Sequence, residues 1–179
     1  MVRRVSMFLL LTLMFTGVAI SADKKTDMKA RLVLYKEKVN AAAQLINKEG
    51  AQSAERKILD KKGDFFFDSE QGYIFIIDST GNTILNAAKP ALKGKNLLGV
   101  KDVKGVAFFN LFIKMAQKHE NGWVAYSWPK PGAVEAAAKV SYVKMLKKDG
   151  VEYIIGAGPY DVTKEDILKL FPEEAKKAL

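Results

Sequence analysis

The stretch that decides the fold consists of hydrophobic segments in a fixed order: GYIFIID at residues 72–78, TILN at 83–86, GWVAYSWPKPG at 122–132, AKVSYVKML at 138–146 and VEYIIGAGPYD at 151–161. Each is short, rich in β-branched and aromatic residues, and bounded by turn-forming residues, which is typical of β-strands. The STGN sequence between the first two predicts a tight turn. Together they predict one antiparallel sheet with a helical insert after its second strand.

The segment GYIFIID is apolar at almost every position. A strand of this kind is buried on both faces, so both faces of the sheet need a cover. The run Phe65–Phe67 just upstream has the same character and predicts a further strand. The sequence therefore predicts an α+β fold with an antiparallel sheet of five to six strands.

A long helix is predicted upstream of the sheet, from Thr26 to Lys48. Its apolar residues recur at intervals of three and four: Leu32, Tyr35, Val39, Ala42 and Ile46. This spacing is typical of an amphipathic helix. Gly50 ends the helix, and a shorter one follows to Lys62. We expect the apolar stripe to pack on one face of the sheet, and dimerisation as a coiled coil is the alternative.

The insert is expected to contribute the second cover. Residues Ala87 to Asp102 include Pro90, Gly94 and Gly99 and few periodic apolar residues, which predicts a long crossing loop. Residues 105–119 then carry apolar side chains at helical spacing. Long ordered loops in compact domains usually have functional roles, so the loop is a candidate functional segment.

The first 22 residues have the features of a secretory signal peptide. Arg3 and Arg4 precede an apolar run from Val5 to Phe15, and small residues follow up to Ala22. This order matches a basic region, a short hydrophobic region and a cleavage site. We expect cleavage after Ala22 and a periplasmic or secreted protein. The alternative is an uncleaved anchor in the cytoplasmic membrane, although the apolar run is shorter than the ~20 residues that a spanning helix needs.

The composition restricts the classes of function. The chain has 179 residues, no cysteine and one histidine, and its carboxylates do not cluster at metal-ligand spacing. Disulfides, zinc–thiolate sites and cysteine nucleophiles are therefore excluded, and we expect no metal and no cofactor. Neither a Ser-His-Asp set nor a glycine-rich phosphate loop is present, so we expect no catalytic residues and no enzymatic activity.

The net charge of the whole sequence is +9. Loss of residues 1–22 removes two arginines and no acidic residue, so the expected mature protein carries +7. The lysines are dispersed and the expected location is extracytoplasmic, which argues against nucleic acid as a partner. Attraction of small anions is the functional interpretation of this charge, and a solubilising surface is the alternative.

Taken in order, these segments resemble a known family. The similarity rests on Gly72-Tyr73 with Ile76 to Asn82, Pro90 to Leu97, Gly122 to Gly132, Lys139 to Val143 and Ile154 to Asp161. The series resembles the extracytoplasmic single Cache sensor domain, type 2. The resemblance implies a PAS-like fold, with the long N-terminal helix on one face of the sheet and a ligand pocket with the helical insert on the other. It also implies a small organic anion or amino-acid-like metabolite as ligand.

The expected ligand-binding residues are aromatic or polar side chains of the later strands and the insert: Tyr126, Trp128, Lys139, Tyr142, Asn86 and Phe108. Strand alternation places Tyr126 and Trp128 on one face. Lys139 would neutralise a ligand carboxylate, and Tyr142 would donate to the same group. Their odd spacing puts these two on opposite faces of a regular strand, so both contribute only with a bulge or with Lys139 acting from the strand's entry. Core packing is the alternative for the aromatic residues, and a solvated surface lysine is the alternative for Lys139.

The expected organisation is a signal peptide at residues 1–22, N-terminal helices at 23–63, the Cache sheet and insert at 64–162, and a C-terminal helix and tail at 163–179. Asn86 stands where related sequences often have a histidine. We expect a stand-alone exported, non-catalytic binding module that passes ligand occupancy to a membrane receptor, kinase or transporter. The alternative is a structural or interaction module that forms a homodimer through its long N-terminal helix.

Overall fold

The structure is a computed structural model that describes residues 16–177. The helices are α1 (Thr16–Glu49), α2 (Ala51–Leu59), α3 (Phe108–His119) and α4 (Lys164–Leu170), with the short 3-10 helices η1 (Pro90–Leu92) and η2 (Pro172–Lys177). The strands are β1 (Phe66–Phe67), β2 (Gly72–Tyr73), β3 (Phe75–Asp78), β4 (Thr83–Asn86), β5 (Asn121–Pro129), β6 (Ala136–Lys148) and β7 (Val151–Ala157). Most of the predicted signal peptide, residues 1–15, lies outside the described residues.

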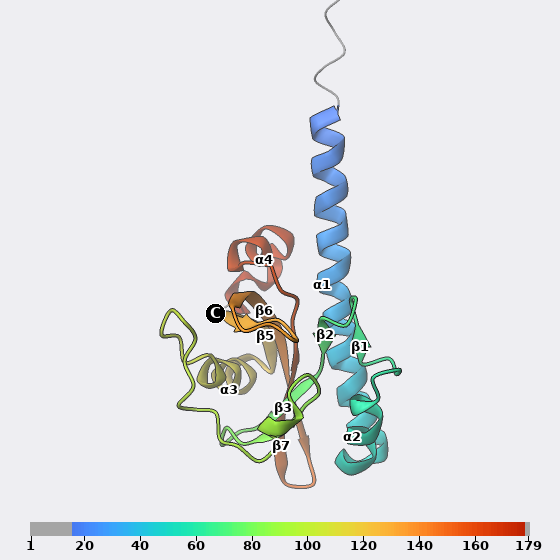
Figure 1. Ribbon diagram of the computed structural model, residues 1–179, viewed down its shortest axis with the longest axis vertical. Helices are drawn as coiled ribbons and strands as arrows, with labels where there is room; N and C mark the ends of the chain where they lie inside the picture. Colours follow the sequence, from blue (N-terminus) through green and yellow to red (C-terminus); the bar gives the residue numbers. More distant parts are fainter. Residues whose placement is uncertain (1–15, 178–179) are drawn as a thin grey trace, which may run out of the picture.

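Helix α1 is the longest helix of the described part and projects beyond the rest of the domain (Figure 1). It begins at Thr16, upstream of the start predicted at Thr26. The predicted apolar stripe is buried along its whole length: Leu32, Tyr35, Val39, Ala42 and Ile46. Gly50 follows the helix with a φ of 82°, a left-handed conformation that favours glycine. Neither α1 nor another helix of residues 16–177 combines the length and hydrophobicity needed to cross a bilayer.

The main sheet has five antiparallel strands in the order β4-β3-β7-β6-β5. The predicted antiparallel sheet with a helical insert is confirmed, because a loop and α3 separate β4 from β5. In the interior of the sheet, Phe75 of β3 is the partner of Gly156 of β7. At one edge, β5 pairs with β6 along its whole length and places Tyr126 opposite Lys139.

The segment GYIFIID differs from the prediction, because it forms two strands instead of one. Gly72–Tyr73 pairs with Phe66–Phe67 in a separate two-stranded ribbon, and Phe75–Asp78 pairs with β4 and β7. The chain changes its pairing partner at Ile74, which belongs to neither strand. The predicted strand at Phe65–Phe67 therefore exists, but it lies outside the main sheet.

The turn of this ribbon has an unusual backbone. Asp68, Ser69 and Glu70 have φ values of 51°, 53° and 64°, which non-glycine residues seldom adopt. The Asp68 carboxylate accepts hydrogen bonds from Arg31 Nε at 2.8 Å and from the Tyr35 hydroxyl at 2.7 Å. Helix α1 therefore fixes the turn through a side chain of the turn itself.

Each face of the sheet has its own core. Helix α1 lies on one side of the sheet and α3 on the other (Figure 1). On the face covered by α1, Ile76, Tyr142 and Ile155 are buried. On the face covered by α3, Phe75 and Val143 are buried instead. Neighbouring residues such as Phe75 and Ile76 thus point to opposite faces, as strand geometry requires. The predicted positions of the N-terminal helix and the helical insert are confirmed.

The loop between β4 and α3 is tied to both edges of the sheet. Beside β4, the Gly94 N–H donates to the Thr83 carbonyl at 2.8 Å, and the Thr83 N–H donates to Lys95 at 2.9 Å. At the other edge, the Asp102 carboxylate accepts a hydrogen bond from the Ser127 N–H of β5 at 2.9 Å. The loop therefore crosses the α3 face between fixed ends.

Beyond β7 the chain runs very close to β6 at Gly158. A Cβ atom at this position would lie 2.1 Å from the Val140 carbonyl oxygen and 2.4 Å from Ser141 Oγ. Only glycine permits this approach of one backbone to another. The approach allows Tyr160 to form an isolated β-bridge with Lys139.

We expect Gly158→Ala to lower the free energy of unfolding by about 3 kcal/mol, because the added methyl group overlaps backbone atoms. Gly99→Ala is the matched control, since no heavy atom lies within 4 Å of its Cβ position. Urea unfolding monitored by circular dichroism measures both variants. Equal stability of the two would contradict the close approach at Gly158.

Candidate functional site

A small cavity lies on the α3 face of the sheet. It is lined by Tyr73, Phe75, Asn86, Phe108, Phe109, Phe112, Tyr126 and Trp128. These residues come from β2, β3, β4, α3 and β5, so both the insert and the sheet build the site. The volume open to the centre of a water-sized sphere is about 10 Å³, which is roughly the room for one water molecule.

Aromatic rings fill most of the space around this cavity. Phe108 stacks on Tyr126 with ring centroids 4.3 Å apart and an interplanar angle of 13°. Phe75 stacks on Phe112 at 5.1 Å, and Trp128 meets the Phe108 ring edge-on at 5.3 Å. The rings form an apolar wall that suits the carbon atoms of a small molecule.

Lys139 lies beside the cavity and is only 1% exposed. Its Nζ donates to the Tyr73 hydroxyl at 2.9 Å and to the Tyr160 hydroxyl at 3.1 Å. The Tyr160 hydroxyl donates in turn to the Pro129 carbonyl at 2.9 Å. Tyr73 also lines the cavity, so it connects the amine to the aromatic wall. Lysine is seldom fully buried, and a buried ionisable group at a cavity indicates a functional site.

Burial lowers the pKa of Lys139 well below its usual value, and the positive charge of Lys89 lowers it further. Burial also raises the pKa of Tyr73 to about 12 and that of Tyr126 well above its usual range. These two hydroxyl groups therefore stay protonated at neutral pH and can both donate and accept. Among the described residues, no group of His, Asp and Glu side chains is arranged to hold a metal ion.

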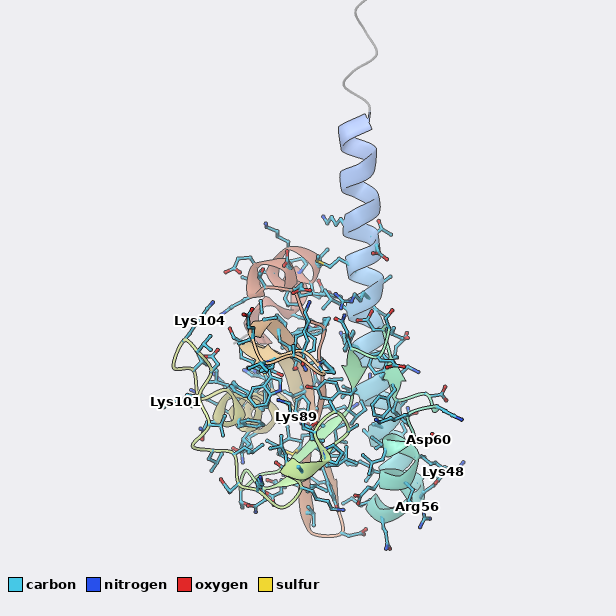
Figure 2. All side chains as sticks on the ribbon, viewed as in Figure 1. Lys48, Arg56, Asp60, Lys89, Lys101 and Lys104 are labelled. Carbon is cyan, nitrogen blue, oxygen red and sulfur yellow. The ribbon has the colours of Figure 1, made fainter. Side chains whose placement is uncertain are left out.

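A second lysine lies at the edge of the site. The Nζ atom of Lys89 is 5.0 Å from the centre of the Trp128 ring. Its backbone N–H donates to Asn86 Oδ1 at 2.8 Å, so one turn positions both residues. Figure 2 labels Lys89 near the middle of the molecule, whereas Lys101 and Lys104 lie on the outer part of the loop. Lys89 therefore adds positive charge where the aromatic wall meets solvent.

The Asp102 carboxylate holds the part of β5 that faces the cavity. It accepts hydrogen bonds from the N–H groups of Val106 and Ser127, both at 2.9 Å. Burial alone raises the pKa of Asp102, but the backbone hydrogen bonds outweigh it and the pKa falls below its usual value. Ser127 stands between Tyr126 and Trp128, so Asp102 steadies the segment that carries both rings.

The structure brings most of the predicted ligand-binding residues together. Four line the cavity: Asn86, Phe108, Tyr126 and Trp128. Lys139 contacts Tyr73 just behind the lining. Tyr142 lies on the opposite face, where its ring centroid is 5.2 Å from that of Trp123. The β5–β6 register runs without a bulge between Lys139 and Tyr142, so the odd spacing keeps Tyr142 away from the cavity.

Other residues of the site were not predicted as ligand-binding. They include Tyr73, which lines the cavity, and Tyr160, whose hydroxyl accepts a hydrogen bond from Lys139. The position of Tyr160 depends on the turn back at Gly158, which no local pattern reveals. Lys89 carries a weak signal in the sequence, because it directly precedes Pro90 in the crossing loop.

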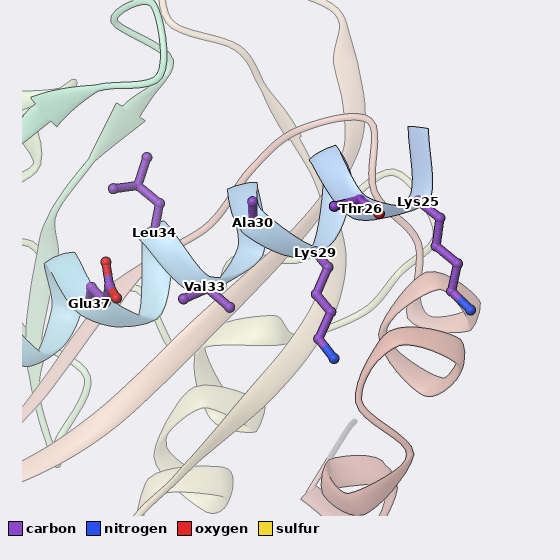
Figure 3. Close-up of a pocket in the computed structure, with 7 residues that line it drawn as sticks. All are labelled: Lys25, Thr26, Lys29, Ala30, Val33, Leu34 and Glu37. Carbon is purple, nitrogen blue, oxygen red and sulfur yellow. The ribbon is translucent and has the colours of Figure 1, made fainter. Parts of the chain in front are cut away.

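A second hollow, of about 500 Å³, runs along α1 and is separate from the aromatic cavity. It is lined by Lys25, Thr26, Lys29, Ala30, Val33, Leu34 and Glu37. Figure 3 shows these side chains on successive turns of the helix. The hollow is an open groove formed by one helix, and its walls supply no buried polar group that would orient a small ligand.

We expect Lys139→Met to remove a pH dependence of stability. Folding lowers the pKa of Lys139, so below about pH 10.4 the unfolded chain binds more protons than the folded chain. The free energy of unfolding of the unchanged protein should therefore decrease as the pH falls from about 9.5. The slope is at most about 1.4 kcal/mol per pH unit and ends where the folded Lys139 is protonated.

Chemical denaturation between about pH 7 and about pH 9 measures this slope while tyrosine hydroxyls remain largely protonated. Lys95→Met is the matched control, because Lys95 is exposed. The control should keep the slope, and Lys139→Met should lose it. The same slope in both variants would contradict a neutral Lys139 in the folded chain.

The chain is similar to parts of signalling proteins. It is 33% identical to the methyl-accepting chemotaxis protein McpP of Pseudomonas putida over 131 residues, which are 73% of this chain and 23% of that protein. It is 32% identical to the sensor histidine kinase MctS of Rhizobium johnstonii over 91 residues, which are 51% of this chain and 19% of that protein. The chain thus spans about a fifth of the length of these relatives.

Solved structures share the fold. A methyl-accepting chemotaxis protein from Vibrio parahaemolyticus has a TM-score of 0.65 and 29% identity, over 85% of this chain and 99% of that one. A Cache chemosensory domain described as recognising carboxylic acids has a TM-score of 0.58 and 24% identity, over 84% of this chain and 100% of that one. The family model described as Cache domain (dCache_2) matches residues 21–179. The chain therefore belongs to the Cache domain family.

Proposed function

We propose that this chain is an extracytoplasmic, non-catalytic sensor module that binds a small carboxylate or an amino-acid-like metabolite in the aromatic cavity. The observation that carries the proposal is the buried amine of Lys139, held by the hydroxyl groups of Tyr73 and Tyr160 beside an aromatic wall. An amine in this position gives a carboxylate a charge-assisted hydrogen bond away from water.

The groups around the cavity favour an anion. Lys139 and Lys89 are basic, and the lining contains no acidic residue. The tyrosine hydroxyl groups add neutral donors, and Asn86 adds an amide. A cation would find no opposite charge in this lining, whereas a carboxylate has two amines and several donors within the same region.

The size of the cavity favours a small ligand. About 10 Å³ does not hold even a two-carbon acid, so the rings must move when a ligand enters. Trp128 is only partly buried and Lys89 lies over it, so this pair forms the part of the wall that can open at the lowest cost. A long or branched ligand would require the loss of several ring contacts at once.

The relatives support the same class of ligand and role. One solved Cache neighbour is described as recognising carboxylic acids, and the sequence relatives are a chemotaxis receptor and a sensor kinase. We propose accordingly that ligand occupancy is passed to a receptor, kinase or transporter of the membrane, and that the domain lies in the periplasm or is secreted. The predicted signal peptide at residues 1–22 supports export.

We expect acetate, propionate, butyrate, pyruvate, glycine or alanine to raise the melting temperature of the chain in a saturable manner. A ligand at a hundred times its Kd stabilises a folded protein by about 2.7 kcal/mol, which is readily measured by differential scanning fluorimetry. Trp128→Ala should weaken binding at least about tenfold, since the contact of an aromatic ring that closes over a ligand contributes more than ~1.4 kcal/mol.

Tyr142→Phe is the matched control for this experiment. It removes a tyrosine hydroxyl from the opposite face of the same sheet, where Tyr142 packs on Trp123. Binding should persist in this variant. Absence of stabilisation by every member of the panel would count against a carboxylate or amino-acid-like ligand, and equal losses in both variants would place the ligand elsewhere.

The groove along α1 favours a second candidate function, a homodimer through this helix. Ala30, Val33 and Leu34 lie on the part of α1 that is not fully covered by the sheet (Figure 3). The lining also holds Lys29 and Glu37, so an antiparallel second copy would place opposite charges against each other. This function would concern assembly and would not depend on the aromatic cavity.

We expect Leu34→Lys to separate the two candidates. If α1 joins two copies, sedimentation velocity should show a dimer for the unchanged chain and a monomer for the variant, because a charge in an apolar helix interface is costly. Ligand stabilisation should be the same in both. A monomeric unchanged chain at the highest soluble concentration would exclude dimerisation through α1.

A further inference from the structure

The hydrogen bonds around Lys139 account for two protons on its Nζ atom. One N–H donates to the Tyr73 hydroxyl and one to the Tyr160 hydroxyl. Within residues 25–174 the contacts of this Nζ include no carboxylate. A neutral amine has two N–H donors, and an ammonium group has three. The network therefore satisfies the neutral amine and leaves the third proton of an ammonium group without an acceptor.

Some groups around Lys139 stabilise its ammonium form, and others stabilise its neutral form. The Tyr73 and Tyr160 ring centroids lie 4.2 and 4.3 Å from Nζ and favour the ammonium form. Burial and the positive charge of Lys89 favour the neutral form. Tyr126, the cross-strand partner from β5, has a hydroxyl that bonds to Ser141 at 2.9 Å and stays uncharged.

The acidic side chains that adjoin Tyr160 in sequence or through Arg31 are paired with other bases. Asp68 of the ribbon turn binds Arg31 of α1, whose guanidinium also donates to the Tyr160 carbonyl at 3.1 Å. Asp161 pairs with Lys130 at the surface at 2.6 Å. From α3, the cavity lining includes only phenylalanine rings. Since no carboxylate of the described residues contacts Lys139, the anion that balances its protonated form is expected to be a ligand.

We propose that Lys139 is a neutral amine before a ligand binds and takes up one proton when a carboxylate enters, so that each ligand is bound together with a proton. The inference rests on the proposed function of the same cavity. The balance is simple: a carboxylate anion, a neutral amine and one proton from solvent give a buried carboxylate–ammonium pair. The third N–H of Lys139 then has the carboxylate as its acceptor.

The proposal predicts that the affinity for a carboxylate depends on pH because Lys139 takes up a proton, and not because the ligand itself titrates. Above the pKa of Lys139 in the folded protein, the proton that accompanies the ligand becomes tenfold scarcer with each pH unit. The association constant should therefore fall about tenfold per pH unit in this range and stay constant below it. Short carboxylates remain fully ionised in this range, so their own titration adds nothing.

Isothermal titration of the unchanged chain with propionate, and with acetate and pyruvate beside it, tests the proposal. At about pH 8 to about pH 9.5, the heats in buffers of different ionisation enthalpy should give an uptake of about one proton per ligand. Over the same range the affinity should fall about tenfold per pH unit. Lys95→Met should behave like the unchanged chain, and Lys139→Met should lose both the proton uptake and most of the affinity.

A second measurement does not depend on a variant that must fold. Nitrogen-15 NMR of the side-chain Nζ atoms should show one lysine as a neutral amine at about pH 8, where ordinary lysines are ammonium groups. Propionate should move this signal to the ammonium position. A neutral signal that shifts in this way supports the proposal.

The outcomes separate this inference from the function on which it rests. Saturable binding without proton uptake, or an Nζ spectrum with ammonium signals alone before propionate is added, would overturn the proton-coupled mechanism and leave the ligand site intact. Failure of acetate, propionate and pyruvate to bind at all would overturn the carboxylate site, and the proton-coupled mechanism would fall with it.

Discussion

The structure depends on a sheet that must be covered on both faces. β3 and β7 lie in its interior, and their side chains are apolar toward α1 as well as toward α3. The long helix α1 covers one face with a continuous stripe. The other face receives a shorter helix and a crossing loop, so aromatic rings fill the remaining space. The cavity exists because this second cover is assembled from separate pieces.

Helix α1 is connected to Lys139 through Tyr160. Tyr160 contacts Lys139 with its hydroxyl group on the cavity side and accepts a hydrogen bond from Arg31 of α1 at its carbonyl. Arg31 and Tyr35 also hold Asp68, in the turn that leads to Tyr73. Contacts therefore run without a break from the helix on one face to the amine on the other. This continuity connects the candidate ligand site, through Tyr160, to the element that projects farthest from the domain.

The sequence predicts the fold well where a local period controls it. The stripe from Leu32 to Ile46 is buried as its spacing indicates, and the alternation of Tyr126 and Trp128 matches their shared place in the cavity wall. The odd spacing of Lys139 and Tyr142 likewise indicates the opposite faces on which they lie. These features depend only on the geometry of one helix or one strand.

Features that depend on residues far apart in the chain could not be predicted from the sequence. GYIFIID is uniformly apolar and gives no sign that its pairing changes at Ile74. The left-handed turn at Asp68 uses no glycine, so its position is not marked. Tyr160 joins Lys139 only because Gly158 lets two backbones meet, and the full burial of Lys139 follows from that meeting. Lys139 follows a run of alanines, and this pattern is equally typical of a lysine on the surface.

The network around Lys139 also has a consequence for the order in which the chain folds. Lys139 bonds to Tyr73 across 66 positions of sequence, and Tyr73 and Tyr160 meet across 87. Contacts of such separation require the closure of long loops. Loop closure lowers the conformational entropy of the chain before the contacts form and stabilise it. Helices α1 and α3 form from local contacts and can appear early. The hydrogen bonds among Lys139, Tyr73 and Tyr160, in contrast, form only after the strands of the sheet have paired. Their presence therefore indicates that the chain has folded completely.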